Sequence, residues 1–428
     1  MMMMRKGLFY LATYVLAVVM FSGCSSDNHE GDIVIDMLPK TRSVDLTQEQ
    51  KEYVKRSNDF ALNLYKAVIQ GQNDNKSTIV SPFSAVYMLG MLNDGSAGKT
   101  AEEISTVLGF GKDGKQAINE FCKAMIEQTP EVDPSVLLQT ANCVVVNDKQ
   151  HVELQDQFVN DISKYYKGEV MTLNFASAKS LDRINNWSDQ HTDGMIPTLI
   201  NQLNEDAAML LLNAISFKAT WTEKFDEKDT QIETFTKEDG TTESVKMMHR
   251  HAIARVGEGS DFYTLLLPYG SGDKWSMTIF LPKEGKTVSD VVNSLDMSKW
   301  STYAYEYPST RDVDIKLPRF ENTYKADIKN ALQRMGVLSM FDADNADLSL
   351  ICKNKRLCVS MMEQTTAIEV SEEGTKTSTV TIAELGDIEE YGISGDKVFF
   401  YANQPFVYII REASSGAVFF IGTYQGNS

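Results

Sequence analysis

Residues 209–221 read MLLLNAISFKATW, and only Asn213 and Ser216 interrupt the apolar run from Met209 to Phe217. A short and nearly continuous apolar run is typical of a strand that is buried on both faces. Residues 136–146 have a similar character. We therefore expect two strands that are covered on both sides by the rest of the protein.

The remainder of the chain has helical patterns early and strand patterns later. Ser81-Pro82 predicts an N-cap followed by proline at the first helical position, and Thr100–Glu103 predicts a capping box. No Pro/Gly-rich linker divides residues 49–428, so we expect a single α+β domain there. Further strands are expected at 262–267, 275–281, 313–317, 359–370, 398–401, 406–410 and 417–424.

The composition excludes several classes of protein. The 428 residues carry a formal net charge of −18. Such an acidic chain lacks the basic footprint of a nucleic-acid binder, and surface charge does not hold it to anionic lipid. Hydrophobic residues make up 43% and charged residues 23%, which excludes wholesale disorder. Five cysteines in this length exclude a disulfide scaffold.

The N-terminus has the pattern of an export signal. Basic residues at 5–6 precede an apolar run at 8–21 and then Ser22-Gly23-Cys24. This end resembles a bacterial lipobox, in which Cys24 becomes the lipidated first residue, and a plain signal peptide with an incidental cysteine is the alternative. We expect a signal peptide at residues 1–23, a flexible tether at 24–48, and a cell-envelope protein whose lipid anchor is its sole membrane contact.

The common motifs of catalysis and metal binding are missing from the sequence. It has no Gly-x-Ser-x-Gly elbow, no His-Glu-x-x-His pair and no Walker loop. His249 and His251 could offer two ligands from one strand face, but no third His or Cys stands nearby in the sequence. We therefore expect no metal site and no cofactor. Four cysteines are expected to be small, buried apolar side chains: Cys122, Cys143, Cys352 and Cys358.

Several motifs, in a fixed order, carry a family resemblance. They are Ser81-Pro-Phe-Ser84 with Gly95 and Thr100-Ala-Glu-Glu-Ile104, Ile184-Asn-Asn-Trp187 with Thr192-Asp-Gly194, Leu211–Trp221 with Phe225, Leu266-Leu-Pro-Tyr269, Ile279-Phe-Leu-Pro282, Leu317-Pro-Arg-Phe320, Asp347-Leu-Ser349, Asn403-Gln-Pro-Phe406 and Ile421-Gly422. Together they cover about residues 50–428, and over that range the chain resembles the serpins.

The resemblance implies the serpin fold, a single domain of about nine helices and three β-sheets with an exposed reactive-centre loop at about residues 371–397. It implies a monomeric suicide inhibitor and not an enzyme. The target endopeptidase cleaves the loop and forms a covalent acyl-enzyme, after which the loop inserts as a new strand in the largest sheet. The alternative is a non-inhibitory serpin that binds a ligand or a partner in the cell envelope.

Glu372-Glu373-Gly374-Thr375 resembles the hinge at the start of the serpin reactive loop. Because alternate residues of a strand face opposite sides, the segment after it has two faces. Both charges, Lys376 and Glu384, fall on one face. An ordinary surface loop would not need that arrangement, although chance can produce it. The other face, which could be buried if the hydroxyls find partners, holds Thr375, Thr377, Thr379, Thr381 and Ala383.

Family spacing, counted forward from Gly374, puts the reactive bond between Ile388 and Glu389. A backward count from Pro405 points nearer Ser394. Between residues 377 and 396 there is no Lys or Arg, so a protease with an acidic primary pocket would leave its carboxylate unpaired. We expect targets with elastase-, chymotrypsin-, subtilisin- or papain-like specificity. Other candidate cleavage sites are Leu385, Tyr391 and Ile393.

Ser81, Ser84 and Asn213 match the serpin shutter, where polar groups beneath the main sheet control its opening. Trp221 matches the breach, where insertion begins. At the shutter position that usually holds a His, this chain has Gln364, whose amide can donate and accept hydrogen bonds without titrating. All five residues also fit a simpler role in core packing and strand-end hydrogen bonding.

Overall fold

The computed structural model describes residues 40–70, 76–111, 114–272, 274–297, 309–375 and 397–427. They belong to one compact unit that begins at Pro39. In these ranges no helix combines the length and the apolar character that crossing a membrane requires. Residues 42–46, which the sequence places in the tether, pack onto the domain. The Arg42 amide donates to the Val132 carbonyl at 2.7 Å, and the Val44 and Leu46 side chains are buried.

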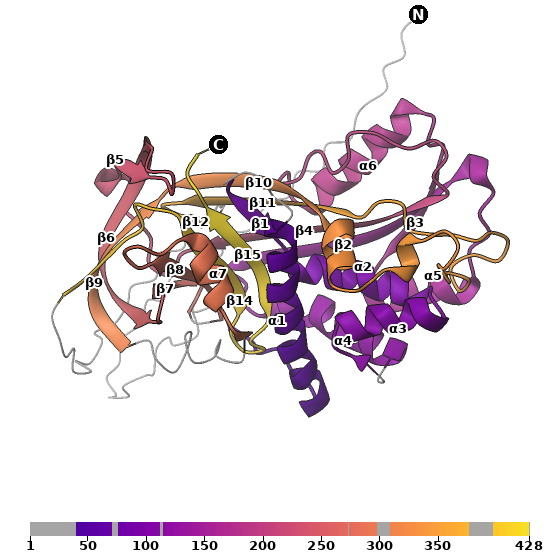
Figure 1. Cartoon of the computed structure of the whole chain (residues 1–428), viewed down its shortest axis with the longest axis horizontal. Helices are drawn as coiled ribbons and strands as arrows, with labels where there is room; N and C mark the ends of the chain where they lie inside the picture. Colours follow the sequence, from indigo (N-terminus) through magenta and orange to yellow (C-terminus); the bar gives the residue numbers. More distant parts are fainter. Residues whose placement is uncertain are drawn as a thin grey trace, which may run out of the picture. The chain divides into compact units, whose positions relative to one another are not determined.

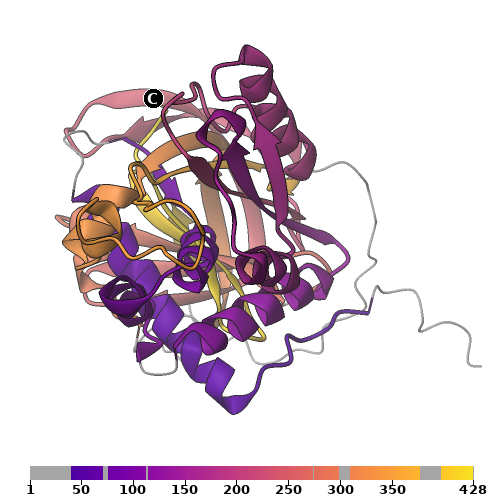
Figure 2. The ribbon, with the colours of Figure 1, turned by 90° about the vertical axis from the view of Figure 1, so that its right-hand side faces the viewer.

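Eight α-helices lie in the described residues, close to the expected number. Figures 1 and 2 show the N-terminal helices, in indigo and purple, gathered together, and α2 contacts α1, α3, α4 and α5. The helices are α1 (Gln48–Ile69), α2 (Pro82–Asp94), α3 (Gly98–Val107), α4 (Gly114–Gln128), α5 (Asp156–Tyr166), α6 (Ala178–His191), α7 (Val288–Ser294) and α8 (Ile328–Arg334).

One of the two expected helix starts is confirmed. Ser81 is the N-cap of α2, where its hydroxyl accepts from the Ser84 amide and Pro82 follows directly. The capping box expected at Thr100 is wrong, because α3 begins two residues earlier, at Gly98. Thr100 Oγ1 instead accepts from the Asp347 amide at 3.0 Å, and Glu103 accepts from the amides of residues 338 and 339. Both side chains therefore join α3 to a distant segment.

The six-stranded sheet contains the two long strands predicted from the apolar runs. β2 and β4 pair antiparallel from Val136 with Ala219 to Val146 with Met209. In spatial order the strands are β10 (Phe320–Asp327), β11 (Glu363–Ser371), β12 (Gly374–Thr375), β4 (Met209–Thr220), β2 (Val136–Asn147) and β3 (Glu169–Leu173).

The other strands form one nine-stranded sheet. The described residues therefore contain two hydrogen-bonded sheets, whereas three were expected. The reason is β6, which is continuous over 17 residues and pairs with β9 along its middle, with β5 at its start and with β7 at its end. The order is β1 (Thr78–Val80), β15 (Val418–Tyr424), β14 (Phe406–Glu412), β8 (Trp275–Pro282), β7 (Phe262–Tyr269), β6 (Thr242–Glu258), β9 (Ser309–Pro318) and β13 (Val398–Tyr401), with β5 (Gln231–Thr236) beside β6.

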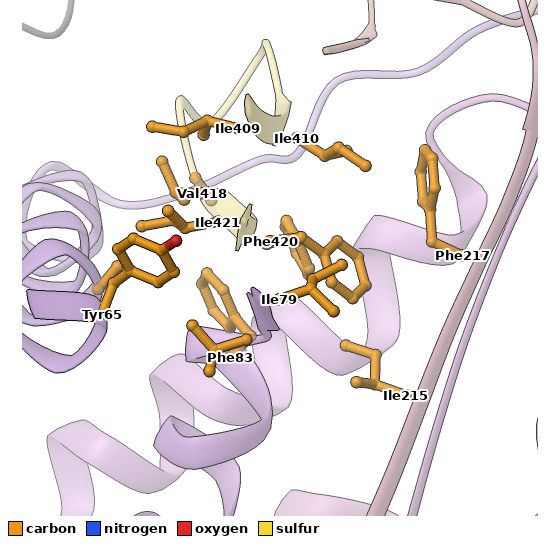
Figure 3. Close-up of a cluster of buried hydrophobic side chains, with 14 of the residues drawn as sticks. Tyr65, Ile79, Phe83, Ile215, Phe217, Ile409, Ile410, Val418, Phe420 and Ile421 are labelled. Atoms are coloured by element: carbon orange, nitrogen blue, oxygen red, sulfur yellow. The ribbon is translucent and has the colours of Figure 1, made fainter. Parts of the chain in front are cut away.

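Both sheets and the first two helices contribute to one hydrophobic core (Figure 3). Phe217 from β4 lies with its ring centroid 6.0 Å from that of Phe420 on β15. Phe83 of α2 stacks on Phe419 at 4.5 Å. The six-stranded sheet is therefore packed against the rest of the domain through large side chains, which stabilise it by burial of apolar surface.

Candidate functional site

The chain turns back after β11 and enters the six-stranded sheet as the short strand β12. Thr375 pairs with Val370 of β11 on one side and with Ala219 of β4 on the other, and both pairings are antiparallel. In the spatial order of the described strands, β11 and β4 are joined through β12. The first two residues of the expected hinge strand, Gly374 and Thr375, are thus already in the sheet, and both are buried.

A glycine is required at position 374, where the chain joins the six-stranded sheet. Its φ of +137° is a conformation that residues with a side chain rarely adopt. A Cβ atom placed there would lie 2.2 Å from the carbonyl oxygen of Ala219. The glycine therefore lets the turn approach the end of β4 closely.

Trp221, the expected breach residue, holds the turn on both sides. Its backbone amide donates to the Glu373 carbonyl at 2.9 Å, and its indole Nε1 donates to the Ser371 carbonyl at 2.9 Å. The indole also stacks on Tyr269, with ring centroids 4.4 Å apart and 9° between the planes. Tyr269 in turn shares a 3.0 Å hydrogen bond with Thr375 Oγ1.

The two glutamates of the hinge have opposite environments. Glu372 is buried, and its carboxylate accepts from Thr230 Oγ1 at 2.8 Å and lies 3.6 Å from Arg319 Nη1. Its carbonyl accepts from the Phe225 amide. Glu373 is partly exposed and forms an ion pair with Lys224. The buried carboxylate fixes the turn, because moving it would leave a charge without these partners.

Gln364 meets α2 at the expected shutter. Its Oε1 accepts from the Ser81 amide at 2.9 Å, and its Nε2 donates to the Ser81 carbonyl at 2.8 Å. Thr366 Oγ1 donates to the same Oε1 at 3.3 Å. The amide therefore joins β11 to the start of α2 by donating and accepting at the same residue, and Ser84 contributes its amide to the Ser81 side chain.

Asn213 belongs to a second, separate hydrogen-bond group. Its Nδ2 donates to Asn142 Oδ1 at 2.9 Å across the β2–β4 pair, and Asn142 Nδ2 donates to the Tyr166 carbonyl at 2.8 Å. The hypothesis that Asn213 shares one network with Ser81, Ser84 and Gln364 is corrected to this extent. Gln364 and Asn213 lie on β11 and β4 of the sheet, and Ser81 and Ser84 lie at the start of α2. They form two groups because Asn213 is in register with Asn142.

Downstream of the loop, the described chain resumes at Lys397 and runs into β13. This strand pairs parallel with β9, and Lys397 Nζ lies 3.3 Å from Asp314 Oδ2. His249 on β6 also hydrogen-bonds Asp314. Burial alone would raise the pKa of Asp314, but the hydrogen bonds from His249 and Lys397 outweigh burial and hold its pKa below the ordinary value.

The two histidines rejected as metal ligands have aspartate partners on β9. His249 contacts Asp314, and His251 Nε2 lies 2.5 Å from Asp312 Oδ1. No group of three or more potential ligands gathers in the described ranges.

Cys122, Cys143 and Cys352 are buried, as expected, and burial raises the pKa of the Cys143 thiol to about 12. Cys358 is exposed, so the expectation that it is buried is wrong.

The other site residues expected from the sequence lie outside the described residues. They are Cys24, Thr377, Thr379, Thr381 and Ala383, together with the reactive bond at Ile388 and Glu389.

Four further residues complete the site, and the sequence analysis did not assign them to it. Asn142 interrupts an apolar run just as Asn213 does, so its polar side chain in a buried strand was a usable signal. Tyr269 is the last residue of β7 and contacts Thr375. Thr230 directly precedes β5 and Arg319 directly follows β9, and both contact Glu372. Nothing in their local sequence indicates contact with the hinge, because the contact depends on how distant strands pair.

Comparison with known proteins gives consistent matches. A family model described as Serpin (serine protease inhibitor) matches residues 55–425. An uncharacterized serpin-like protein of Thermococcus kodakarensis is 30% identical over 403 residues, covering 93% of this chain and 91% of that protein. The native state of the thermophilic serpin tengpin has a TM-score of 0.78 at 25% identity, over 91% of this chain and 98% of tengpin. Human thyroxine-binding globulin shares the fold, with a TM-score of 0.78 at 24% identity over 87% and 98% of the two chains.

Proposed function

The chain belongs to the serpin family, and on this premise we propose that it is a suicide inhibitor of serine endopeptidases, with cysteine endopeptidases as a second class of target. The protease nucleophile attacks the carbonyl carbon of Ile388, and the peptide bond to Glu389 breaks. The new amino group of Glu389 leaves with a proton from the protease's general acid. The Ile388 carbonyl stays on the protease as an ester or thioester while the freed loop inserts between β11 and β4.

The observation that carries this proposal is the position of β12. Gly374 and Thr375 already pair with both strands between which the loop has to insert. Thr375 is buried with its hydroxyl on Tyr269. Because strand residues alternate, Thr377, Thr379, Thr381 and Ala383 would follow Thr375 on the same face if the strand continued. Small and uncharged side chains are what that face requires.

Insertion is favourable because it adds backbone hydrogen bonds, each with a net value of about 0.5–1.5 kcal/mol. Protein that has been cleaved in the loop should therefore melt at a higher temperature than intact protein. We also propose that Cys24 carries the lipid and anchors the domain at the cell envelope. Partition of the wild-type chain into detergent, and loss of that partition in Cys24→Ser, would test the anchor without reference to inhibition.

The test of inhibition is incubation of the mature chain with a panel of proteases, followed by denaturing electrophoresis. We expect a covalent complex with elastase-, chymotrypsin-, subtilisin- or papain-like enzymes. A strictly Arg/Lys-specific protease should form none, since residues 377–396 contain no cation. Cleavage of the loop without any complex, and without a rise in melting temperature, would contradict the proposal and favour a non-inhibitory serpin that binds a ligand or a partner.

A further inference from the structure

A cavity of about 410 Å³ lies where β6 separates from β7. β6 pairs with β7 only from Arg255 to Glu258, and with β5 only from Thr242 to Met247. Between those two pairings β9 is the one described strand that pairs with β6, and residues of β6, β7 and β9 line the cavity. Its volume falls within the range of about 300–1,000 Å³ that is typical of small-molecule sites.

The lining combines apolar walls with an excess of positive charge. The apolar lining consists of Ile253 and Ala254 from β6 and of Leu266 and Pro268 from β7. Among the lining residues that the structure describes, the charged ones are two arginines, Arg250 and Arg255, and one glutamate, Glu223. This local excess contrasts with the net charge of −18 on the whole chain.

Arg250 is the central feature of the cavity. Its side chain is only 11% exposed, and its guanidinium lies over the Phe225 ring at 4.9 Å. Nη1 donates to the Glu223 carbonyl, while the Glu223 carboxylate stays 3.8 Å away and Nε has no hydrogen-bond partner. Burial lowers the pKa of Arg250, as expected for a cation with incomplete compensation. A second anion near this group would therefore be stabilised.

The floor of the cavity adds a polar group. Ser276 Oγ accepts from Arg411 Nε at 3.3 Å, and Arg411 is fully buried beneath it. Because the Ser276 oxygen acts as an acceptor for Arg411, its own proton can be donated to a ligand oxygen.

We propose that this cavity binds a small amphipathic carboxylate. The apolar body lies between Ile253 and Leu266, and the carboxylate lies against the guanidinium of Arg250.

The cavity adjoins the segment that holds the hinge. The Thr222 amide donates to the Pro268 carbonyl, and the Trp221 and Phe225 amides donate to the carbonyls of Glu373 and Glu372. A ligand that joins Arg250 to this segment would stabilise residues 221–225 in their present position. It would then slow further opening of the sheet. This consequence rests on the proposed function, but the binding of the ligand does not.

The test uses the full mature chain and a matched pair of probes, biphenyl-4-carboxylate and biphenyl-4-carboxamide, in isothermal titration calorimetry. The two probes have the same apolar body, and only the first carries a negative charge. We expect saturable one-to-one binding of the carboxylate and at least tenfold weaker binding of the carboxamide. Absence of saturable carboxylate binding, or equal affinity for both probes, would overturn the proposal.

Three variants locate the site. Ile253→Trp fills the mouth of the cavity from a position that is 43% exposed, and it should weaken carboxylate binding at least tenfold. Arg250→Met should do the same by removing the cation. Arg183→Met, a matched change on α6 far from this lining, should leave the affinity within twofold. The assignment would be contradicted if Ile253→Trp left the carboxylate affinity unchanged, or if Arg183→Met reduced it equally. If Arg250→Met does not fold, Ile253→Trp alone tests the site.

Failure of this inference is distinguishable from failure of the proposed function. Binding is measured without a protease, and covalent complex formation is measured without the probe. If the wild-type chain binds the carboxylate and also inhibits, we expect saturating probe to slow complex formation. An unchanged rate would remove the link to the hinge but would not affect the binding site.

Discussion

The two ends of the reactive loop are held in different ways. Upstream, Gly374 and Thr375 are buried and pair with a strand on each side. Downstream, β13 pairs with one described strand only, in parallel, and Phe399 on it is 62% exposed. The upstream end is fixed by backbone pairing and by the buried, hydrogen-bonded carboxylate of Glu372, whereas Lys397 and Asp314 hold the start of the downstream end by charge near the surface.

This difference indicates which physical changes each end should respond to. The upstream end lies in a space bounded by Ala219 and Tyr269, so added volume or a buried charge should disturb it strongly. The downstream end should respond to the loss of one carboxylate and to salt, since partly exposed ion pairs are screened. The expected effects on the upstream end are the larger ones.

The largest effect is expected from Thr377→Arg. If the strand begun at Thr375 continues, residue 377 shares its buried face, and burial of an unpaired cation costs several kcal/mol. We expect at least about a tenfold fall in the fraction of protease trapped as covalent complex on denaturing gels, with loop cleavage taking its place. Ser378→Arg, on the opposite face, is the matched control and should change that fraction little. Equal losses in the two variants would refute the facing assignment.

Gly374→Ala should disturb the same end through the backbone. The added Cβ would lie 2.2 Å from the Ala219 oxygen at a φ of +137°, and strain of this kind costs roughly 1–3 kcal/mol. We expect β12 to leave the sheet, with faster hydrogen exchange at Thr375 and altered fluorescence of Trp221, which stacks beside it. Gly272→Ala, where nothing lies within 4 Å of the new Cβ, is the control. Unaltered exchange at Thr375 would mean that β12 tolerates a side chain.

Asp314→Asn tests the downstream end. The pKa of Asp314 is lowered in the folded protein, so its contribution to stability is fully present above the ordinary value of 3.8 and is lost as pH falls through the lower folded pKa. At pH 7 we expect a loss of about 1 kcal/mol and, if release of β13 limits spontaneous inactivation, inactivation roughly fivefold faster. Thermal melts and residual inhibitory activity over time are the measurements. Asp312→Asn, whose partner is His251, should have a smaller effect on inactivation, and equal rates would show that Lys397 is not held through Asp314.

The smallest effect at pH 7 is expected from Gln364→His, which tests whether the hydrogen bonds between β11 and Ser81 can be made sensitive to pH. A neutral imidazole can still hydrogen-bond Ser81, but a protonated one cannot accept from the Ser81 amide. Burial should keep the folded pKa of the new histidine below its ordinary value of about 6.5, so stability should be lost as pH falls. We expect a loss of about 1 kcal/mol by pH 5.5, seen as a lower melting temperature than at pH 7.5. Gln139→His on β2 is the control, and a parent protein with the same slope would show that Gln364 is not the determinant.

Local sequence was sufficient for the strands around the site and insufficient for its contacts. The run from Met209 to Phe217 predicted β4 because a short, nearly continuous apolar run is typical of a strand that is buried on both faces. The capping box predicted at Thr100 was wrong because such a pattern is short. The Thr100 hydroxyl instead accepts a hydrogen bond from the Asp347 amide. The partners of Glu372 come from Thr230 and Arg319, more than fifty residues away in the chain. Such pairs follow from the register of whole strands, which no single segment encodes.

The position of β1 has a consequence for the synthesis of the chain. Thr78 to Val80 pair with Ile421 to Thr423, and the hydroxyls of Thr78 and Thr423 hydrogen-bond at 2.8 Å. β15 lies between β1 and β14 in the nine-stranded sheet, so the first of the described strands to be translated cannot pair until the last of them has been made. Contacts this distant close late and slowly, because the entropy of a very long loop has to be overcome first. The nine-stranded sheet therefore cannot be completed before residues 418–424 have been translated, and a chain that ends before Val418 lacks an interior strand of that sheet.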